Sequence, residues 1–217
     1  MTAANLFLQP TAGHLVTDGA VYDSEGVIRH IASKVVEAPA IHFACTFLGM
    51  VDQERIANAL QHRASMFGLS QEAALQSLGP IAADLRLENA SLLPEMEERG
   101  LTGFAIIACT WDHSAGRPRG WIVQTENAPQ QLAEPYTLTE TPGYMTPDVP
   151  LPVDPATGEL SGLLHGREVL EAQRRHKEPD GCHIVGGFGE CTTVTAAGVE
   201  KVRLVDWQDK LGDRIAA

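Results

Sequence analysis

The sequence is poor in basic residues, in aromatic residues and in long apolar runs, and each shortage excludes a class of function. Its 217 residues hold 16 Lys and Arg against 28 Asp and Glu, which gives a formal net charge of −12. A surface of that sign repels phosphate, so we expect no nucleic-acid partner. Only 6% of the residues are aromatic, and Trp111, Trp121 and Trp207 are too scattered to indicate a base-stacking platform.

Membrane spans and export signals are also missing from the pattern. No run reaches the roughly 18 apolar residues that a membrane-spanning helix needs. The start of the sequence lacks the basic stretch and long apolar run of a signal peptide. The four cysteines form no CxxC pair, and three of them lie in apolar, strand-like runs, which favours reduced core thiols. We therefore expect a cytoplasmic protein with no membrane partner.

Metal and cofactor motifs are equally scarce. The eight histidines show no HxH or HExxH spacing. Cys182 and His183 are neighbours in a predicted strand and would face opposite sides of it, which makes them poor metal co-ligands. The short glycine motif at residues 186–189 has no strand-to-helix context, so it does not indicate a phosphate-binding loop. We expect no metal and no cofactor.

The hydrophobic pattern predicts an α/β (α+β) fold of antiparallel sheets with helices packed outside them. The length suits one domain with a sizeable core, and no repeat or linker divides the chain, so residues 1–217 are expected to form a single domain. Strands are predicted at 5–9, 13–17, 27–36, 41–47, 104–110, 120–125, 182–186, 190–195 and 199–205. Helices are predicted at 53–66, from a cap at Ser70 through Leu85, and at 167–177, with a connector at 88–101 and a proline-rich surface loop at 142–155.

A threonine, an aspartate and a lysine lie at equal intervals near the start of the chain. Thr2, Asp18 and Lys34 are separated by sixteen residues each, and Lys34 is one of only four lysines. Proteasome β-subunits begin with a threonine and place an acid and a lysine at the same two intervals. The segments LVTDGAVYDSEGVIRHIASKV and HFACTFLGMVDQERI resemble that family's early strands and first outer helix, and FAIIACTWDHSAGRPRGWIV and VGGFGECTTVTAAGVEKV resemble its later hairpin and last strand pair.

The chain therefore resembles the proteasome β-subunit and, more broadly, the N-terminal-nucleophile (Ntn) hydrolase superfamily. It is also similar to the small standalone proteasome-like proteins of prophages and phage-like gene clusters. The resemblance implies a four-layer αββα sandwich of two antiparallel sheets with outer helices. It further implies a homo-oligomer or a subunit of a larger assembly, and a peptide or amide substrate.

The resemblance also implies a threonine peptidase or amidase site. Removal of Met1 would leave Thr2 with a free α-amine, whose pKa near 8 suits a base for its own hydroxyl. Lys34 would lower the proton affinity of that hydroxyl by its charge, and Asp18 would hold Lys34. The backbone N–H of Gly49 would donate to the oxyanion. The expected reaction is amide hydrolysis through an acyl-Thr2 intermediate.

A second interpretation stays open beside the enzyme. The family carries an Asp and a Ser before its last strand pair, and this chain has Cys182 and Val185 at those positions. An Asp–Lys pair also persists in proteins as a structural ion pair. The alternative is therefore a catalytically silent structural protein of a larger assembly, such as a phage particle, located in the virion.

Overall fold

The computed structural model describes residues 3–23, 25–49, 51, 53–98, 102–150, 160–178 and 181–216. Within these residues the chain forms two five-stranded antiparallel sheets and one two-stranded antiparallel sheet, together with α-helices. This is the α+β fold with antiparallel sheets that the sequence predicts. Among the described residues, no helix combines the length and the apolar character needed to cross a membrane.

The first sheet joins strands from both ends of the sequence. Its order is β10-β1-β2-β11-β12, so the early hairpin lies directly beside the last strand pair. Side chains alternate between two buried faces, as the twofold period of a strand requires. Leu6, Leu15 and Val194 face the second sheet, whereas Phe7 and Val16 face a helix. The strands are β1 (Ala4–Gln9), β2 (Ala12–Asp18), β10 (Tyr144–Thr146), β11 (Phe188–Thr195) and β12 (Gly198–Asp206).

The second sheet has the order β5-β6-β7-β8-β9 and packs against the first. Its central strands read as nearly continuous apolar runs because both of their faces are covered. Its members are β5 (Val36–Ala38), β6 (Phe43–Gly49), β7 (Phe104–Asp112), β8 (Arg117–Gln124) and β9 (Thr139–Thr141), with the 3-10 helix η1 (Pro39–Ile41) between the first two.

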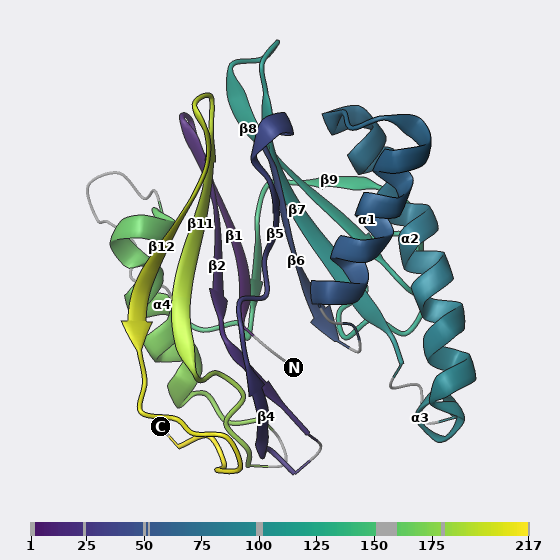
Figure 1. Cartoon of the computed structure of the whole chain (residues 1–217). Coiled ribbons are helices and arrows are strands. Elements are labelled where there is room, and N and C mark those ends of the chain that lie inside the picture. The colour runs from purple at the N-terminus through teal and green to yellow at the C-terminus, as the bar shows by residue number, and fades with distance from the viewer. Residues whose placement is uncertain are drawn as a thin grey trace.

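Helices cover the outer face of each sheet (Figure 1). Helices α1 (Gln53–Phe67) and α2 (Gln71–Leu92) lie on the second sheet, and α2 buries Leu78, Ile81 and Leu85 against it. Helix α4 (Gly162–Arg175) lies on the first sheet and buries Val169 and Leu170 there. Ser70 and Ser161 cap α2 and α4 by accepting a bond from a first-turn N–H.

The segment that the sequence predicts as one strand, 27–36, is divided between two sheets. Strand β4 (Ile28–Ile31) pairs with β3 (Ala20–Tyr22), and β5 then joins the second sheet. Residues 32–35 form the irregular crossing between them, and the Thr46 hydroxyl fixes that crossing by donating to the Lys34 carbonyl at 3.0 Å. This break in the strand is what brings Lys34 between the sheets.

Three other local predictions are wrong in part. The predicted connector at 88–101 contains the end of α2 and a further helix, α3 (Pro94–Glu98), because proline is well accepted in a first helical turn. The proline-rich surface loop at 142–155 contributes the buried strand β10, while its residues 151–159 lie outside the described part. Residues 182–186 form no strand.

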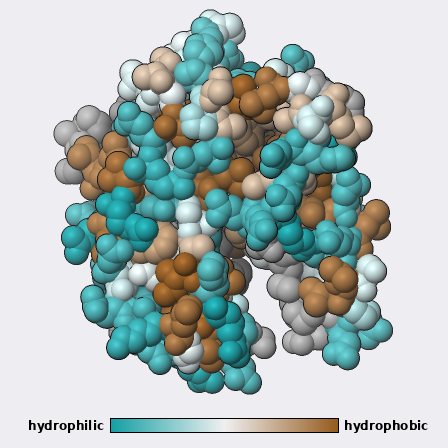
Figure 2. Space-filling view, viewed as in Figure 1, coloured by the Kyte–Doolittle hydropathy of each residue, from teal (hydrophilic) through white to brown (hydrophobic). Residues whose placement is uncertain are grey.

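The space-filling view shows where this architecture is open. A deep indentation divides the lower part of the face in Figure 2, between the half that holds β4 and the half that holds α2 and α3. Strand β2 ends toward that side of the molecule (Figure 1). Asp18 is the last residue of β2.

Candidate functional site

A buried ion pair joins the end of β2 to the crossing segment. The Lys34 Nζ lies 2.7 Å from Asp18 Oδ1, and both side chains are almost inaccessible, at 4% and 0% exposure. Breaking such a pair leaves an uncompensated charge in a medium of low polarity, which is costly. The sixteen-residue interval between Asp18 and Lys34 thus corresponds to a direct contact.

The Asp18 carboxylate is also surrounded by backbone donors. Oδ1 accepts from the Ala3 N–H at 3.0 Å, and Oδ2 accepts from Gly186 N–H at 3.0 Å and from Ala20 N–H at 3.3 Å. Hydrogen bonds to a carboxylate are stronger than neutral ones and stabilise its charged form. One side chain therefore ties together the start of β1, the Lys34 ammonium and the loop before β11.

Opposing effects act on the Lys34 ammonium. Burial lowers the pKa of Lys34 below its ordinary value, and the negative charges of Asp18 and Glu190 act in the opposite direction. Desolvation penalises the charged form, while an opposite charge nearby favours it. Lys34 is therefore held in a position where small changes in its neighbours change its affinity for a proton.

Glu190 connects the pair to a second polar group at the edge of the sheets. This glutamate is 2% exposed and sits opposite Thr17 in the β2–β11 ladder. It accepts a hydrogen bond from the Ser33 hydroxyl, next to Lys34, and lies 3.8 Å from the Lys201 ammonium. Lys201 in turn donates to Ser33 at 2.8 Å and pairs with Glu37. Sequence reasoning missed Glu190, because only the strand pairing places it beside Lys34.

The four residues predicted for catalysis are only partly placed by the structure. Asp18 and Lys34 are brought together, as described above. Thr2 lies outside the described residues, although the peptide bond that joins it to Ala3 ends at the nitrogen bound to Asp18. Gly49 lies at the end of β6, the strand whose Thr46 holds the Lys34 carbonyl.

Gly49 adopts a conformation that favours glycine. Its φ is +104°, and a Cβ atom there would lie 2.4 Å from the Gly103 carbonyl oxygen. A side chain is therefore excluded both by backbone strain and by lack of space. The turn that β6 makes before α1 depends on this residue, whatever its N–H group binds.

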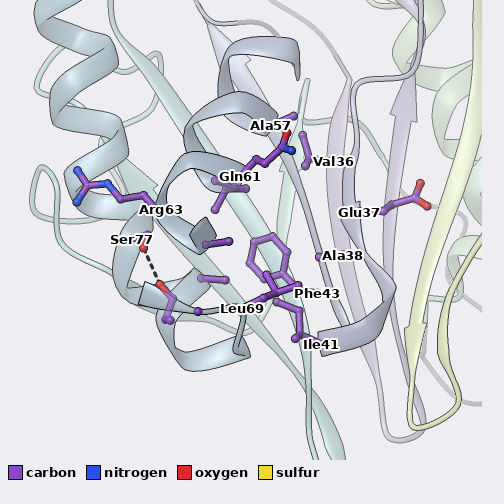
Figure 3. A pocket seen from close by; sticks show the side chains of 15 residues that line it. Val36, Glu37, Ala38, Ile41, Phe43, Ala57, Gln61, Arg63, Leu69 and Ser77 are labelled. Carbon is purple, nitrogen blue, oxygen red and sulfur yellow. Dashed lines mark hydrogen bonds between the residues drawn. The ribbon is translucent and has the colours of Figure 1, made fainter. Parts of the chain in front are cut away.

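An apolar cavity of about 330 Å³ lies in another part of the molecule, between α1, α2 and the β5–β6 edge. Figure 3 shows Val36, Phe43 and Ile41 on its sheet side and Gln61 on its helix side. The Glu37 side chain points away from it, toward the other sheet (Figure 3). Neither Asp18 nor Lys34 is among its lining residues, so the cavity is separate from the ion pair.

The described residues contain no group of three or more His, Cys, Asp or Glu side chains arranged to hold a metal ion. The polar atoms around Asp18 and Lys34 include the Asp18 and Glu190 carboxylates, the Lys34 ammonium and several backbone N–H groups. Such a set of groups is able to orient and stabilise charge near a nucleophile. It contacts the backbone nitrogen of Ala3, the residue that follows Thr2.

Comparisons with known proteins find likeness at the level of structure. No family model matches the sequence. No curated protein matches it either. An Anbu protein from Hyphomicrobium sp. strain MC1, solved as a (Gly-1) mutant, superposes with a TM-score of 0.62 at 12% identity, over 97% of this chain and 89% of that one. Anbu (ancestral beta-subunit) from Yersinia bercovieri gives a TM-score of 0.58 at 12% identity, over 94% and 87%.

These findings correct the resemblance drawn from the sequence. The superfamily named there was that of the Ntn hydrolases, with standalone phage-encoded proteins as a special case. The two neighbours reported are Anbu proteins, and the described chain consists mostly of antiparallel sheets with few helices. The Ntn and phage assignments are therefore wrong as stated. What the likeness shows is a proteasome-like fold of the Anbu kind.

Proposed function

We propose that the chain is a peptidase or amidase in which the hydroxyl of Thr2 attacks the substrate. The observation that carries this proposal is that one carboxylate, Asp18, binds both the backbone nitrogen of Ala3 and the Lys34 ammonium. The residue after Thr2 and a buried cation are thereby held by the same group. The Anbu protein from Yersinia bercovieri is called an ancestral beta-subunit, which agrees with this interpretation.

The first half of the reaction forms an acyl-enzyme. With Met1 removed, the Thr2 amine takes the proton of its own hydroxyl as Oγ1 bonds to the substrate carbonyl carbon. Lys34 favours the alkoxide form of that oxygen, and Asp18 keeps Lys34 in place. The Gly49 N–H donates to the oxyanion, an interaction of about 3–4 kcal/mol in comparable sites. The C–N bond then breaks, and the leaving amine takes the proton from the Thr2 ammonium.

The second half returns the enzyme to its starting state. A water molecule attacks the ester carbonyl carbon while the Thr2 amine accepts one of its protons. The bond between that carbon and Thr2 Oγ1 breaks, Oγ1 regains a proton from the Thr2 ammonium, and the carboxylic acid product leaves. No group beyond the chain and water is needed for this balance.

The remaining expectations belong to the same proposal. Residues 1–217 act as one domain, and the two sheets with their outer helices make up a four-layer αββα sandwich. The protein works in the cytoplasm, as a homo-oligomer or as a subunit of a larger assembly, and a homo-oligomer of it is expected to have closed symmetry.

The alternative is a catalytically silent subunit of a larger assembly, and one observation favours it. Asp18 is fully enclosed and satisfied by Lys34 and three backbone N–H groups, an arrangement that suits a structural ion pair as well. Under this alternative the pair stabilises the fold, and Thr2 carries out no chemistry.

Labelling with a peptide epoxyketone separates the two functions, because this electrophile reacts with both the hydroxyl and the amine of an N-terminal threonine. We expect one adduct per untagged chain, located on Thr2 by tandem mass spectrometry, and none in Thr2→Ala. Thr11→Ala, which changes an exposed threonine, is the matched control and should label like the wild type. An unlabelled, folded wild-type protein contradicts the enzyme and supports the silent subunit.

A further inference from the structure

The loop before β11 binds the carboxylate oxygen of Asp18 that Lys34 does not contact in the ion pair. Gly186 donates its N–H to Asp18 Oδ2 at 3.0 Å, and its carbonyl accepts from Gly19 and Ala20 at 3.1 and 2.9 Å. Gly187 follows with a φ of +75° and has Ile31 and Ala20 within 3.1 Å of the position of a Cβ atom. The position of this loop therefore determines one of the donors that the Asp18 carboxylate receives.

A second buried ion pair also binds the loop before β11. Arg174, at the end of α4, forms two bonds of 2.7 Å to the two carboxylate oxygens of Asp209. The side chains of Arg174 and Asp209 are 10% and 6% exposed. Both partners also bind the loop, since Arg174 donates to the Val185 carbonyl at 2.8 Å and Asp209 accepts from the Gly187 N–H at 2.7 Å. A bidentate Arg–carboxylate pair fixes geometry better than a single bond does.

The segment that carries Asp209 is itself anchored next to the site. Gly212 donates to the Ile28 carbonyl and Ile28 donates to the Asp213 carbonyl, both at 2.9 Å. Ile215 is buried against Ala20 and Ile28. Residues 207–216, which we call the C-terminal clamp, therefore run along the β3–β4 hairpin that leads into Lys34. The clamp therefore contacts both the loop before β11 and the β3–β4 hairpin, which precedes Lys34 in the chain.

We propose that Arg174 and Asp209 are positioning residues, which hold Gly186 against Asp18 and so set the geometry of the Asp18–Lys34 pair. This inference rests on the proposed function for its catalytic meaning, although its structural part stands alone. Cys182 and Val185 stand where proteasome β-subunits carry an acid and a serine, and the clamp supplies a carboxylate to this loop from a different segment. Asp209 approaches the loop from sequence positions that lie after β12.

The physical consequence reaches Lys34 through Asp18. If the Gly186 N–H moves away, the Asp18 carboxylate interacts more strongly with Lys34, and water gains access to the pair. Both changes favour the ammonium form of Lys34. Among the described residues, the charged groups that act on the pKa of Lys34 are Asp18 on β2 and Glu190 on β11. Beyond Glu190 lie Lys201 on β12 and Glu37 on β5, whereas Arg174 and Asp209 act on Asp18 through the loop that carries Gly186.

The test compares Asp209→Asn with Asp206→Asn, a matched change three residues earlier at a carboxylate whose side chain is 72% exposed. The Nζ and Cε signals of Lys34 are followed by NMR in lysine-labelled protein, where four lysines give few signals. We expect Asp209→Asn to raise the pKa of Lys34 measurably. We also expect it to slow epoxyketone labelling about tenfold, because the Asp18–Lys34 pair is no longer held in the geometry that serves Thr2. Asp206→Asn should change neither quantity.

Arg174→Lys provides a second variant if Asp209→Asn does not fold, because it retains the cation and loses the bidentate pair. Its Lys34 pKa should rise in the same direction, and Arg174→Lys should label more slowly than wild type. An unchanged Lys34 pKa in the folded variants overturns the positioning role of Arg174 and Asp209, whether or not the enzyme is active. If the wild-type protein fails to label but Asp209→Asn raises the Lys34 pKa, the proposed function is overturned. The positioning role of Arg174 and Asp209 is then supported on its own.

Discussion

Strand β2 carries two buried polar residues four positions apart, Asp18 and His14. Asp18 contacts a group of opposite charge, whereas His14 contacts neutral groups. Asp18 meets the Lys34 ammonium at 2.7 Å and accepts further bonds from backbone N–H groups. His14 meets the Thr193 hydroxyl at 3.0 Å and the Gln9 side chain at 2.8 Å, and it lies 3.7 Å from the Cys191 sulfur. The groups around Asp18 form the first cluster and those around His14 form the second. The second cluster contains a cysteine and a histidine, as a catalytic Cys–His dyad does, yet its charged states are not stabilised in the same way.

The difference between the two clusters is the presence of an opposite charge. Burial lowers the pKa of His14 to about 4 and raises the pKa of Cys191 to about 11, so both are neutral near pH 7. The thiolate is the reactive form of cysteine. Burial and the negative charge of Glu190 act against it, whereas the Thr193 hydroxyl favours it, and the pKa of Cys191 stays above its ordinary value. Proximity of two reactive residue types therefore identifies a candidate site only when the charged state is also stabilised.

The largest effect is expected from removing the cation of the first cluster. Lys34→Met leaves Asp18 buried without its ionic partner, and we expect the free energy of unfolding to fall by about 3–5 kcal/mol. Epoxyketone labelling of Thr2 should fall by at least about a hundredfold. Chemical denaturation followed by circular dichroism gives the first quantity, and timed mass spectrometry gives the second.

Two further variants separate the stability of the pair from its chemistry. Lys210→Met removes an exposed lysine and should change neither quantity. The double variant Asp18→Asn/Lys34→Met should regain part of the lost stability, because no buried charge remains, but it should not regain labelling. Recovery of labelling in the double variant would contradict a catalytic role for the pair.

The second cluster predicts a pH dependence of stability. His14 stays neutral in the folded protein down to about pH 4, whereas an unfolded histidine accepts a proton near pH 6.5. Between these values only the unfolded state binds the proton, so stability falls as pH decreases from 6.5 to 4. We expect a loss of about 2–3 kcal/mol from this group.

This loss is measured as the difference between wild type and His14→Gln in denaturation experiments from pH 7 to pH 4. The variant should show a shallower decline, because glutamine retains polar contacts but does not titrate. His62→Gln, at an exposed position of α1, serves as the control and should follow the wild type. Equal pH profiles for wild type and His14→Gln would mean that His14 is not buried as a neutral ring.

The smallest effect is expected at Cys191. Cys191→Ala should leave epoxyketone labelling within about twofold of wild type and reduce stability by about 1 kcal/mol, because it removes one buried sulfur atom. Iodoacetamide at pH 8 should modify Cys182, which is only half-buried, well before Cys191. Peptide mapping checks this order, and early alkylation of Cys191 would show that the dyad-like cluster is reactive.

The sequence anticipated contacts that depend on regular strands close together along the chain. The resemblance to proteasome β-subunits implied that Asp18 holds Lys34, and the two residues lie in contact, although their catalytic role stays a prediction. Periodicity also located β1, β2, β7 and β8 to within a few residues. Such features follow from local alternation of apolar residues, which one sequence displays directly.

Other features depend on contacts that a single sequence does not display. Glu190 reaches Lys34 only because β11 pairs with β2, and Arg174 meets Asp209 across 35 residues. Asp209 lies in a segment without regular structure, so no periodicity marks it. The break between β4 and β5 was missed because residues 27–36 alternate well enough to indicate one continuous strand. Tertiary packing decided each of these cases.

The central claim, that Asp18 and Lys34 serve a nucleophile at Thr2, is tested most directly by the N-terminal residue of the untagged protein. Intact-protein mass spectrometry with N-terminal sequencing determines it in one experiment. We predict a chain that begins at Thr2, whose free amine is able to act as a base. A chain that retains Met1 would contradict the claim, because the Thr2 nitrogen would then be an amide.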